Sequence, residues 1–188
     1  ATLNLAATAA QCARIFKKLD AAFADKCLRA AEQAWKAAHQ HPDRFAPPGG
    51  EGGGAYDDKE VQDEFYWAAA ELFITTGGDE YRDFLSKLPP EQKAVLGVVG
   101  KEADDPDRYT AMTWQDTRAL GTLSLATVPS GLSKAQRKAA RQSVIEAADH
   151  YVELTDKEGY RLPLRPGSNN NYPWASIFSV INNMLVMA

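Results

Sequence analysis

The stretch DKEVQDEFYWAAAELFITTGG, residues 58–78, decides the fold class of this chain. Its apolar side chains recur at the spacing of one helix face, at Val61, Phe65, Ala68 and Leu72. This spacing predicts a helix from about residue 58 to residue 74. The pair Gly77 and Gly78 ends it, because glycine readily adopts the left-handed conformation found at helix C-termini.

The same periodicity continues on both sides of this stretch. It predicts further helices that carry residues 5–19, 23–38, 79–88, 113–126, 144–151 and 174–188. Asp20 is a predicted N-cap, and Ser133 with Gln136 forms a predicted capping box. Segment 93–99 fits either a helical turn or a strand, and no alternating strand pair is evident. We therefore predict an all-α fold of about six main helices joined as hairpins.

Composition excludes several classes of protein. The chain has 188 residues, 45% of them hydrophobic, and a net charge of −4, which is typical of a globular protein with one core. Nucleic-acid binding is not expected, because the basic cluster at 134–141 alternates with Ala and Gln as on a solvated helix face. No run approaches the roughly 18 apolar residues of a membrane helix, and no signal-peptide pattern opens the chain.

The sequence contains two cysteines. Cys12 and Cys27 belong to no metal-binding or disulfide framework, so we expect buried free thiols, with one bridge between neighbouring helices as the alternative.

The chain opens at Ala1 inside a helical pattern and closes on the apolar run 184–188. From these ends we expect a single all-α segment, 1–188, that is an excised, truncated or engineered piece of a longer protein.

Carboxylates and aromatic rings are densest between residues 56 and 67. Asp63 and Glu64 lie inside the apolar stripe of the predicted helix, where unpaired carboxylates are costly to bury. They need a cation, hydrogen-bond donors or water. A calcium ion with six to eight oxygen ligands is one solution, with Asp57, Asp58 and Asp116 as candidate contributors; solvent or salt bridges are the other. Aromatic rings beside carboxylates also fit a sugar site, whereas Trp and Tyr at helical spacing equally fit a core.

Seven blocks carry a family resemblance. In chain order they are residues 1–7, 13–16, 23–31, 53–58, 63–72, 114–121 and 172–183. The most specific is GGAYDD at 53–58 followed by DEFYWAAAEL at 63–72. In this order the blocks resemble glycoside hydrolase family nine, the endo-acting and processive cellulases. The resemblance implies that the helices form about half of an (α/α)6 toroid.

The resemblance also implies a reaction, the inverting hydrolysis of β-1,4-glucan or cello-oligosaccharides. In that mechanism an aspartate activates water and a glutamate protonates the leaving oxygen. The family carries its base in an Asp-Ala-Gly-Asp type motif upstream of these blocks and its acid downstream of a His-Arg block. Neither motif occurs in this sequence, so no catalytic residue is predicted and the chain alone is expected to be inactive.

Carried over residue by residue, the resemblance assigns binding roles. Asp63 and Glu64 resemble structural calcium ligands, with Asp116 as a third. Trp114 and Trp174 resemble aromatic platforms of the substrate cleft, and Trp67 is either a wall of that cleft or core. The family usually reads Trp-Gly-Ser-Asn where this chain reads Trp174-Ala175-Ser176-Ile177, which puts the sugar-binding role of Trp174 in doubt.

Location and partners follow from the same resemblance. Family members are secreted, and we expect the parent protein to be extracellular. We expect self-association through the apolar edge that truncation would expose on the end helices. Two alternatives stay open: a helical-hairpin interaction module of the solenoid kind, and a half-enzyme completed by a second chain.

Overall fold

A computed structural model describes residues 1–45, 58, 60–98, 109–166, 171–172 and 175–188 of the chain. Over these residues the helices are α1 (Thr2–Phe16), α2 (Ala21–Gln40), α3 (Gln62–Thr76), α4 (Asp79–Lys87), α5 (Arg118–Thr127), α6 (Lys134–Lys157) and α7 (Ser176–Met187). A 3-10 turn at Pro90–Gln92 and the short strands β1 (Gly97–Val98) and β2 (Tyr109–Thr110) complete the elements. The all-α prediction is confirmed, and no described helix is both long and apolar enough to cross a membrane.

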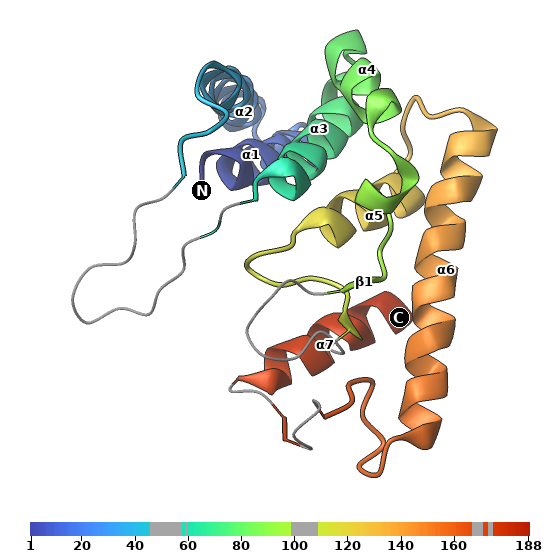
Figure 1. Cartoon of the computed structure of the whole chain (residues 1–188). Helices are drawn as coiled ribbons and strands as arrows, with labels where there is room; N and C mark the ends of the chain where they lie inside the picture. The colour runs from blue at the N-terminus through green and yellow to red at the C-terminus, as the bar shows by residue number, and fades with distance from the viewer. Residues whose placement is uncertain (46–57, 59, 99–108, 167–170, 173–174) are drawn as a thin grey trace. The chain divides into compact units, whose positions relative to one another are not determined.

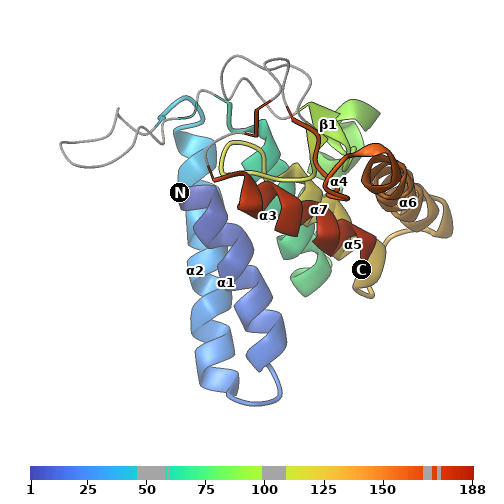
Figure 2. The same ribbon diagram turned by 90° about the horizontal axis from the view of Figure 1, so that it is seen from below.

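The described chain folds as two compact units. The first comprises Ala1–Leu88 with Val128–Gly131, and the second comprises Pro89–Thr127 with Leu132–Ala188. In the first unit, α1 packs against both α2 and α3, and α3 packs against α4 (Figure 1). A short turn joins α1 to α2, and the two helices run side by side as an antiparallel hairpin (Figure 2).

Small side chains make up the buried surface of α1. Ala6, Ala7 and Ala10 are fully buried, whereas Leu5, placed by sequence spacing on the inner face, is exposed. The predicted stripe is therefore wrong at Leu5 and Leu19, both exposed, although its member Ala9 is buried. Because α1 has two helical neighbours, its contact surface is wide, and alanine allows both to approach closely.

Helix α3 is buried on all sides rather than along one stripe. Every residue from Asp63 to Phe73 is buried. The helix begins at Gln62, later than predicted, because the Asp58 carboxylate accepts the backbone N–H of Glu60 at 2.9 Å in a local turn that competes with helix formation. It ends at Thr76, and the C-cap residue Gly77 has a φ of 71°, as the glycine pair predicted.

A cluster of aromatic rings joins α2, α3 and α4. The Trp35 ring meets Phe65, Tyr81 and Phe84 edge-on, with ring centroids 5.4 to 5.7 Å apart.

The Asp20 side chain caps α2 as predicted, accepting the N–H of Phe23 at 2.9 Å. Cys12 and Cys27 are free, as expected, but only half-buried; burial and the neighbouring Cys12 thiol raise the pKa of Cys27.

The second unit is built on α6. This helix packs against α5 and α7, and β2 contacts α7 (Figure 1). The core residues are Val95, Ala111, Met112, Ala119, Ala147, Tyr151 and Val186. The predicted capping box starts α6: Ser133 Oγ accepts the N–H of Gln136, and Gln136 Oε1 accepts the N–H of Ser133. Strands β1 and β2 pair antiparallel, with Gly97 opposite Thr110, so residues 97–98 of the ambiguous segment form a strand.

Helix α5 starts five residues later than predicted, at Arg118 instead of Thr113. Its predicted first turn is bound into a local loop. Thr113 Oγ1 accepts the backbone N–H groups of Gln115 and Asp116 at 3.1 Å, and Asp116 Oδ1 accepts the N–H of Arg118 at 3.2 Å. Because these side chains satisfy backbone donors, the helix begins only after them.

Candidate functional site

Three carboxylates meet at the N-terminal end of α3. Asp63 and Glu64 are buried in the first turn of the helix, and Asp58 lies half-buried before it. One oxygen of each side chain lies within 4.8 Å of the others, which is close enough for one metal ion to contact all three. The sequence placed Asp63 and Glu64 at this site and named Asp58 as a candidate contributor. Asp57, another candidate ligand predicted from the sequence, lies outside the described residues.

The electrostatics of this cluster favour a cation. Burial raises the pKa of Glu64 to about 8, and the adjacent carboxylates of Asp63 and Asp58 add to the rise. Glu64 Oε2 is buried and accepts no hydrogen bond from any residue that the structure describes. An unsatisfied buried oxygen of this kind costs free energy unless a proton or a cation compensates it. The residues present therefore fit a hard, oxygen-liganded metal ion.

Asp116, the third predicted ligand, belongs to the second unit. It is buried, and its Oδ1 accepts Arg118 Nε at 2.7 Å in an ion pair. The carboxylate thus already has a cationic partner, Arg118, within its own loop. Its role as a metal ligand stays a prediction.

The three predicted substrate-binding tryptophans have different surroundings. Trp67 lies in the first unit and is 8% exposed, with its indole N–H donating to Glu71 at 3.3 Å, which favours core over cleft wall. Trp114 is half-buried in the loop before α5 of the second unit. Trp174 lies outside the described residues. The substrate-binding roles of Trp114 and Trp174 stay predictions.

A buried polar network between α1 and α3 was not predicted from the sequence. Glu71 is fully buried, and its carboxylate accepts Arg14 Nη2 and Gln11 Nε2, each at 2.8 Å. Arg14 Nη1 also donates to Thr75 Oγ1 at 2.8 Å. The signal that could have revealed it is Glu71 within the otherwise apolar run 65–74. The network fixes α3, and with it the carboxylate cluster, against α1.

In the second unit, a buried asparagine holds α7 to two loops. Asn183 Oδ1 accepts the N–H of Ala111 at 2.8 Å, and its Nδ2 donates to the carbonyl of Pro163 at 2.7 Å. The neighbouring Asn182 donates to the carbonyl of Met112 at 2.9 Å. The pair Asn182-Asn183 belongs to one of the blocks that carried the resemblance. Its structural task is to hold α7 against residues 111–112, which precede Trp114, and against Pro163.

Comparison with known proteins identifies the family. The sequence profile of glycosyl hydrolase family 9 matches residues 1–188. The chain belongs to this family. Among curated relatives, it is 44% identical over 196 residues to a cellulose 1,4-beta-cellobiosidase of Acetivibrio thermocellus and 40% identical over 190 residues to endoglucanase C of Cellulomonas fimi. Both alignments cover 100% of the chain.

The fold agrees with this family membership. The structure of a metagenome-derived family 9 endoglucanase superposes with a TM-score of 0.79 at 29% identity, over 98% of this chain and 31% of that one. The helices described above are thus part of the (α/α)6 toroid fold of family 9, as the resemblance implied. The chain spans 22% of the cellobiosidase and 16% of endoglucanase C. Neither catalytic motif expected for the family lies within it.

Proposed function

We propose that this chain is the glucan-contacting and metal-binding segment of a family 9 cellulase whose whole protein hydrolyses β-1,4-glucan with inversion. The observation that carries the proposal is the match of all 188 residues to two relatives named as a cellobiosidase and an endoglucanase. A family match over the whole chain favours this function over a helical-hairpin interaction module. A second chain that supplies the missing part remains one way to complete the enzyme.

In this proposal, the chain binds the glucan but does not supply the catalytic residues. Inverting hydrolysis needs one carboxylate on each side of the sugar ring, and the motifs that would supply them are absent from this sequence. Trp114 and Trp174, both in the second unit, would present rings to the C–H faces of the sugar. Trp114 is already half-buried, so a bound sugar would cover the remainder.

The metal we propose is calcium, bound by Asp58, Asp63 and Glu64. Calcium takes six to eight hard oxygen ligands, and three carboxylates offer up to six. Among the described residues, no histidine or cysteine contributes to this cluster, which disfavours zinc. The bound ion would neutralise mutual repulsion at the start of α3, and its contribution would be structural.

A binding titration tests the glucan proposal. Tryptophan fluorescence of the chain would be followed during titration with cellohexaose, and with maltohexaose as the α-linked control. We expect saturable binding of cellohexaose only, weakened in Trp114→Ala and retained in Trp114→Phe, which keeps an aromatic ring. Equal response to both sugars, or none to either, would overturn the proposal.

A hydrolysis assay tests the absence of the catalytic pair. We expect the chain to release no more reducing sugar from carboxymethyl-cellulose than a mock preparation does, because general acid and base catalysis each contribute roughly 100-fold or more. Release well above the mock would mean that catalytic carboxylates lie within these residues.

Cellulose is an insoluble polymer, so an enzyme that degrades it must meet it outside the cell, and we infer an extracellular location.

We also propose that the chain self-associates through α7, where Ile177, Ile181, Met184 and Leu185 each expose more than half of their surface. A second copy of the chain could cover this apolar face.

A further inference from the structure

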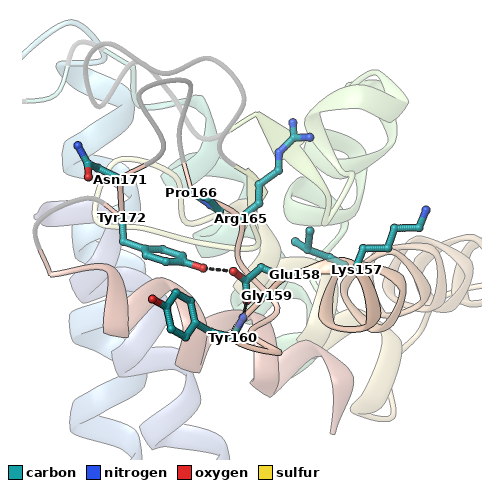
Figure 3. Close-up of a pocket in the computed structure, with 9 residues that line it drawn as sticks. Lys157, Glu158, Gly159, Tyr160, Arg165, Pro166, Asn171 and Tyr172 are labelled. Atoms are coloured by element: carbon teal, nitrogen blue, oxygen red, sulfur yellow. Dashed lines mark hydrogen bonds between the residues drawn. The ribbon is translucent and has the colours of Figure 1, made fainter.

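A pocket of about 750 Å³ lies where α6 ends and the chain turns back toward α7 (Figure 3). Its lining combines apolar and polar side chains of one loop, residues 158–160, 165–166 and 171–172, with Leu154 and Lys157 of α6. All of these residues belong to the second unit. None of them was assigned a role by the sequence or by the family resemblance.

Glu158 organises this loop. Its carboxylate accepts the hydroxyl of Tyr172 and the backbone N–H groups of Tyr160, at 2.6 Å, and Leu162, at 3.2 Å. Desolvation opposes ionisation, but these hydrogen bonds outweigh it and lower the pKa of Glu158. The carboxylate therefore stays charged at neutral pH and links two loop segments that are 14 residues apart.

The bonds to Glu158 present two tyrosine rings together. The ring centroids of Tyr160 and Tyr172 lie 6.2 Å apart, with an angle of 62° between their planes. Tyr160 exposes 78% of its surface, although an aromatic ring gains from burial. Lys157 and Arg165 point away from the two rings, so the faces of the rings are not covered by these long side chains (Figure 3).

This arrangement matches the chemistry of a pyranose. A β-linked glucose unit has apolar C–H faces that stack on aromatic rings and equatorial hydroxyls that need polar partners. Here Glu158 binds the hydroxyl of Tyr172 and the backbone of Tyr160 before any ligand arrives, which lowers the ordering cost of binding. The phenol groups and the exposed Asn171 side chain supply polar atoms at the rim.

We infer that Tyr160 and Tyr172, held by Glu158, form an additional contact site for a glucose unit of β-1,4-glucan. The site is separate in sequence from the predicted Trp114 platform. The inference rests on the proposed glucan-binding function. It assigns Tyr160 the stacking contact, Tyr172 the side wall, and Glu158 the positioning of both.

Calorimetric titration of the 188-residue chain with cellohexaose tests this inference. Tyr160→Ala should weaken binding roughly three- to tenfold, the effect of losing one stacking contact, whereas Tyr160→Phe should bind within about twofold of the unaltered chain. Tyr160 is exposed, so neither change should alter the melting temperature. Glu158→Gln should weaken binding with the ring of Tyr160 still present.

The outcomes separate this inference from the proposed function. If the unaltered chain binds cellohexaose and Tyr160→Ala binds equally well, the tyrosine site is overturned and the glucan-binding function stands. If the unaltered chain does not bind cellohexaose at all, both are overturned. Weaker binding in Tyr160→Ala together with retained binding in Tyr160→Phe supports the site.

Discussion

Arg14 of α1 and Glu71 of α3 form an ion pair, with 2.8 Å between Arg14 Nη2 and Glu71 Oε2 and with the carboxylate fully buried. The arginine stays about one-quarter exposed, so the pair sits at the edge of the helix interface. A buried pair of this kind contributes little net stability compared with apolar residues, but loss of one partner leaves a buried charge uncompensated. The pair therefore joins α1 to α3 through a contact whose loss from one side should be costly.

Replacement of Arg14 by leucine should destabilise the first unit. We expect a loss of about 3 kcal/mol, the lower end of the range for breaking a buried pair, because Gln11 and Trp67 still donate to Glu71. Chemical denaturation followed by circular dichroism measures the loss. The matched control is Arg29→Leu on exposed α2 surface, which should change stability by less than about 0.5 kcal/mol. An equal effect of both changes would contradict the role of the pair.

Calcium should raise the melting temperature of the chain. Binding selective for the folded state stabilises it by mass action, by about 2.7 kcal/mol when free calcium exceeds the Kd 100-fold. Differential scanning fluorimetry in millimolar calcium and in excess chelator gives the shift. Asp63→Ala should abolish the shift, whereas Asp25→Ala, an exposed carboxylate on α2, should leave it intact. Identical melting curves in calcium and chelator would argue against the site.

Acidification should loosen the loop that carries Tyr160 and Tyr172. Because hydrogen bonds lower the pKa of Glu158 below its ordinary value of 4.5, the stability that they add is fully present above that value. It is lost as the pH falls through the lower pKa of the folded state. Carbon NMR of the Glu158 carboxyl should report a midpoint below 4.5. In Tyr172→Phe, which lacks the hydroxyl donor, this midpoint should move upward.

The apolar side chains on α7 should drive self-association. Ile181 and Leu185 are both more than half exposed, and contiguous exposed apolar surface of a few hundred Å² usually recruits a partner. Light scattering should give a mass that rises with concentration into the micromolar range. Ile181→Lys with Leu185→Lys should reduce that rise, whereas the same change at exposed Leu19 of the α1–α2 turn should have less effect. A strictly monomeric mass at every concentration would refute the proposal.

Local signals in the sequence predicted the helix ends where side chain and backbone interact within one turn. The Asp20 cap, the Ser133–Gln136 capping box and the left-handed Gly77 are all confirmed. The sequence predicted helix starts less well at α3 and α5. At both places Asp or Thr side chains bind backbone donors nearby, and helical periodicity alone does not weigh that competition.

In the candidate site, too, local sequence signals predicted some residues, whereas others depended on the tertiary structure. The position of Asp63 and Glu64 inside an apolar stripe was enough to predict that they need compensation, and the structure places Asp58 beside them. Asp116 could not be assigned in this way, because its ion pair with Arg118 depends on how the loop before α5 folds. The pocket around Glu158 was missed, since a Glu-Gly-Tyr turn reads as an ordinary polar loop in the sequence.

The sequence by itself determined that the chain is helical, roughly where its helices lie, and which family it belongs to, because periodicity, caps and ordered motifs are properties of neighbouring residues. Only the tertiary structure decided which helix faces are buried. On α7 the polar Asn183 is fully buried while Ile181 is exposed, since two backbone groups on other segments need the amide as a partner. On α1, close contact with two helices requires alanine and leaves Leu5 outside. Hydrophobicity favours burial in general, but the groups that meet across the fold decide which side chains are buried.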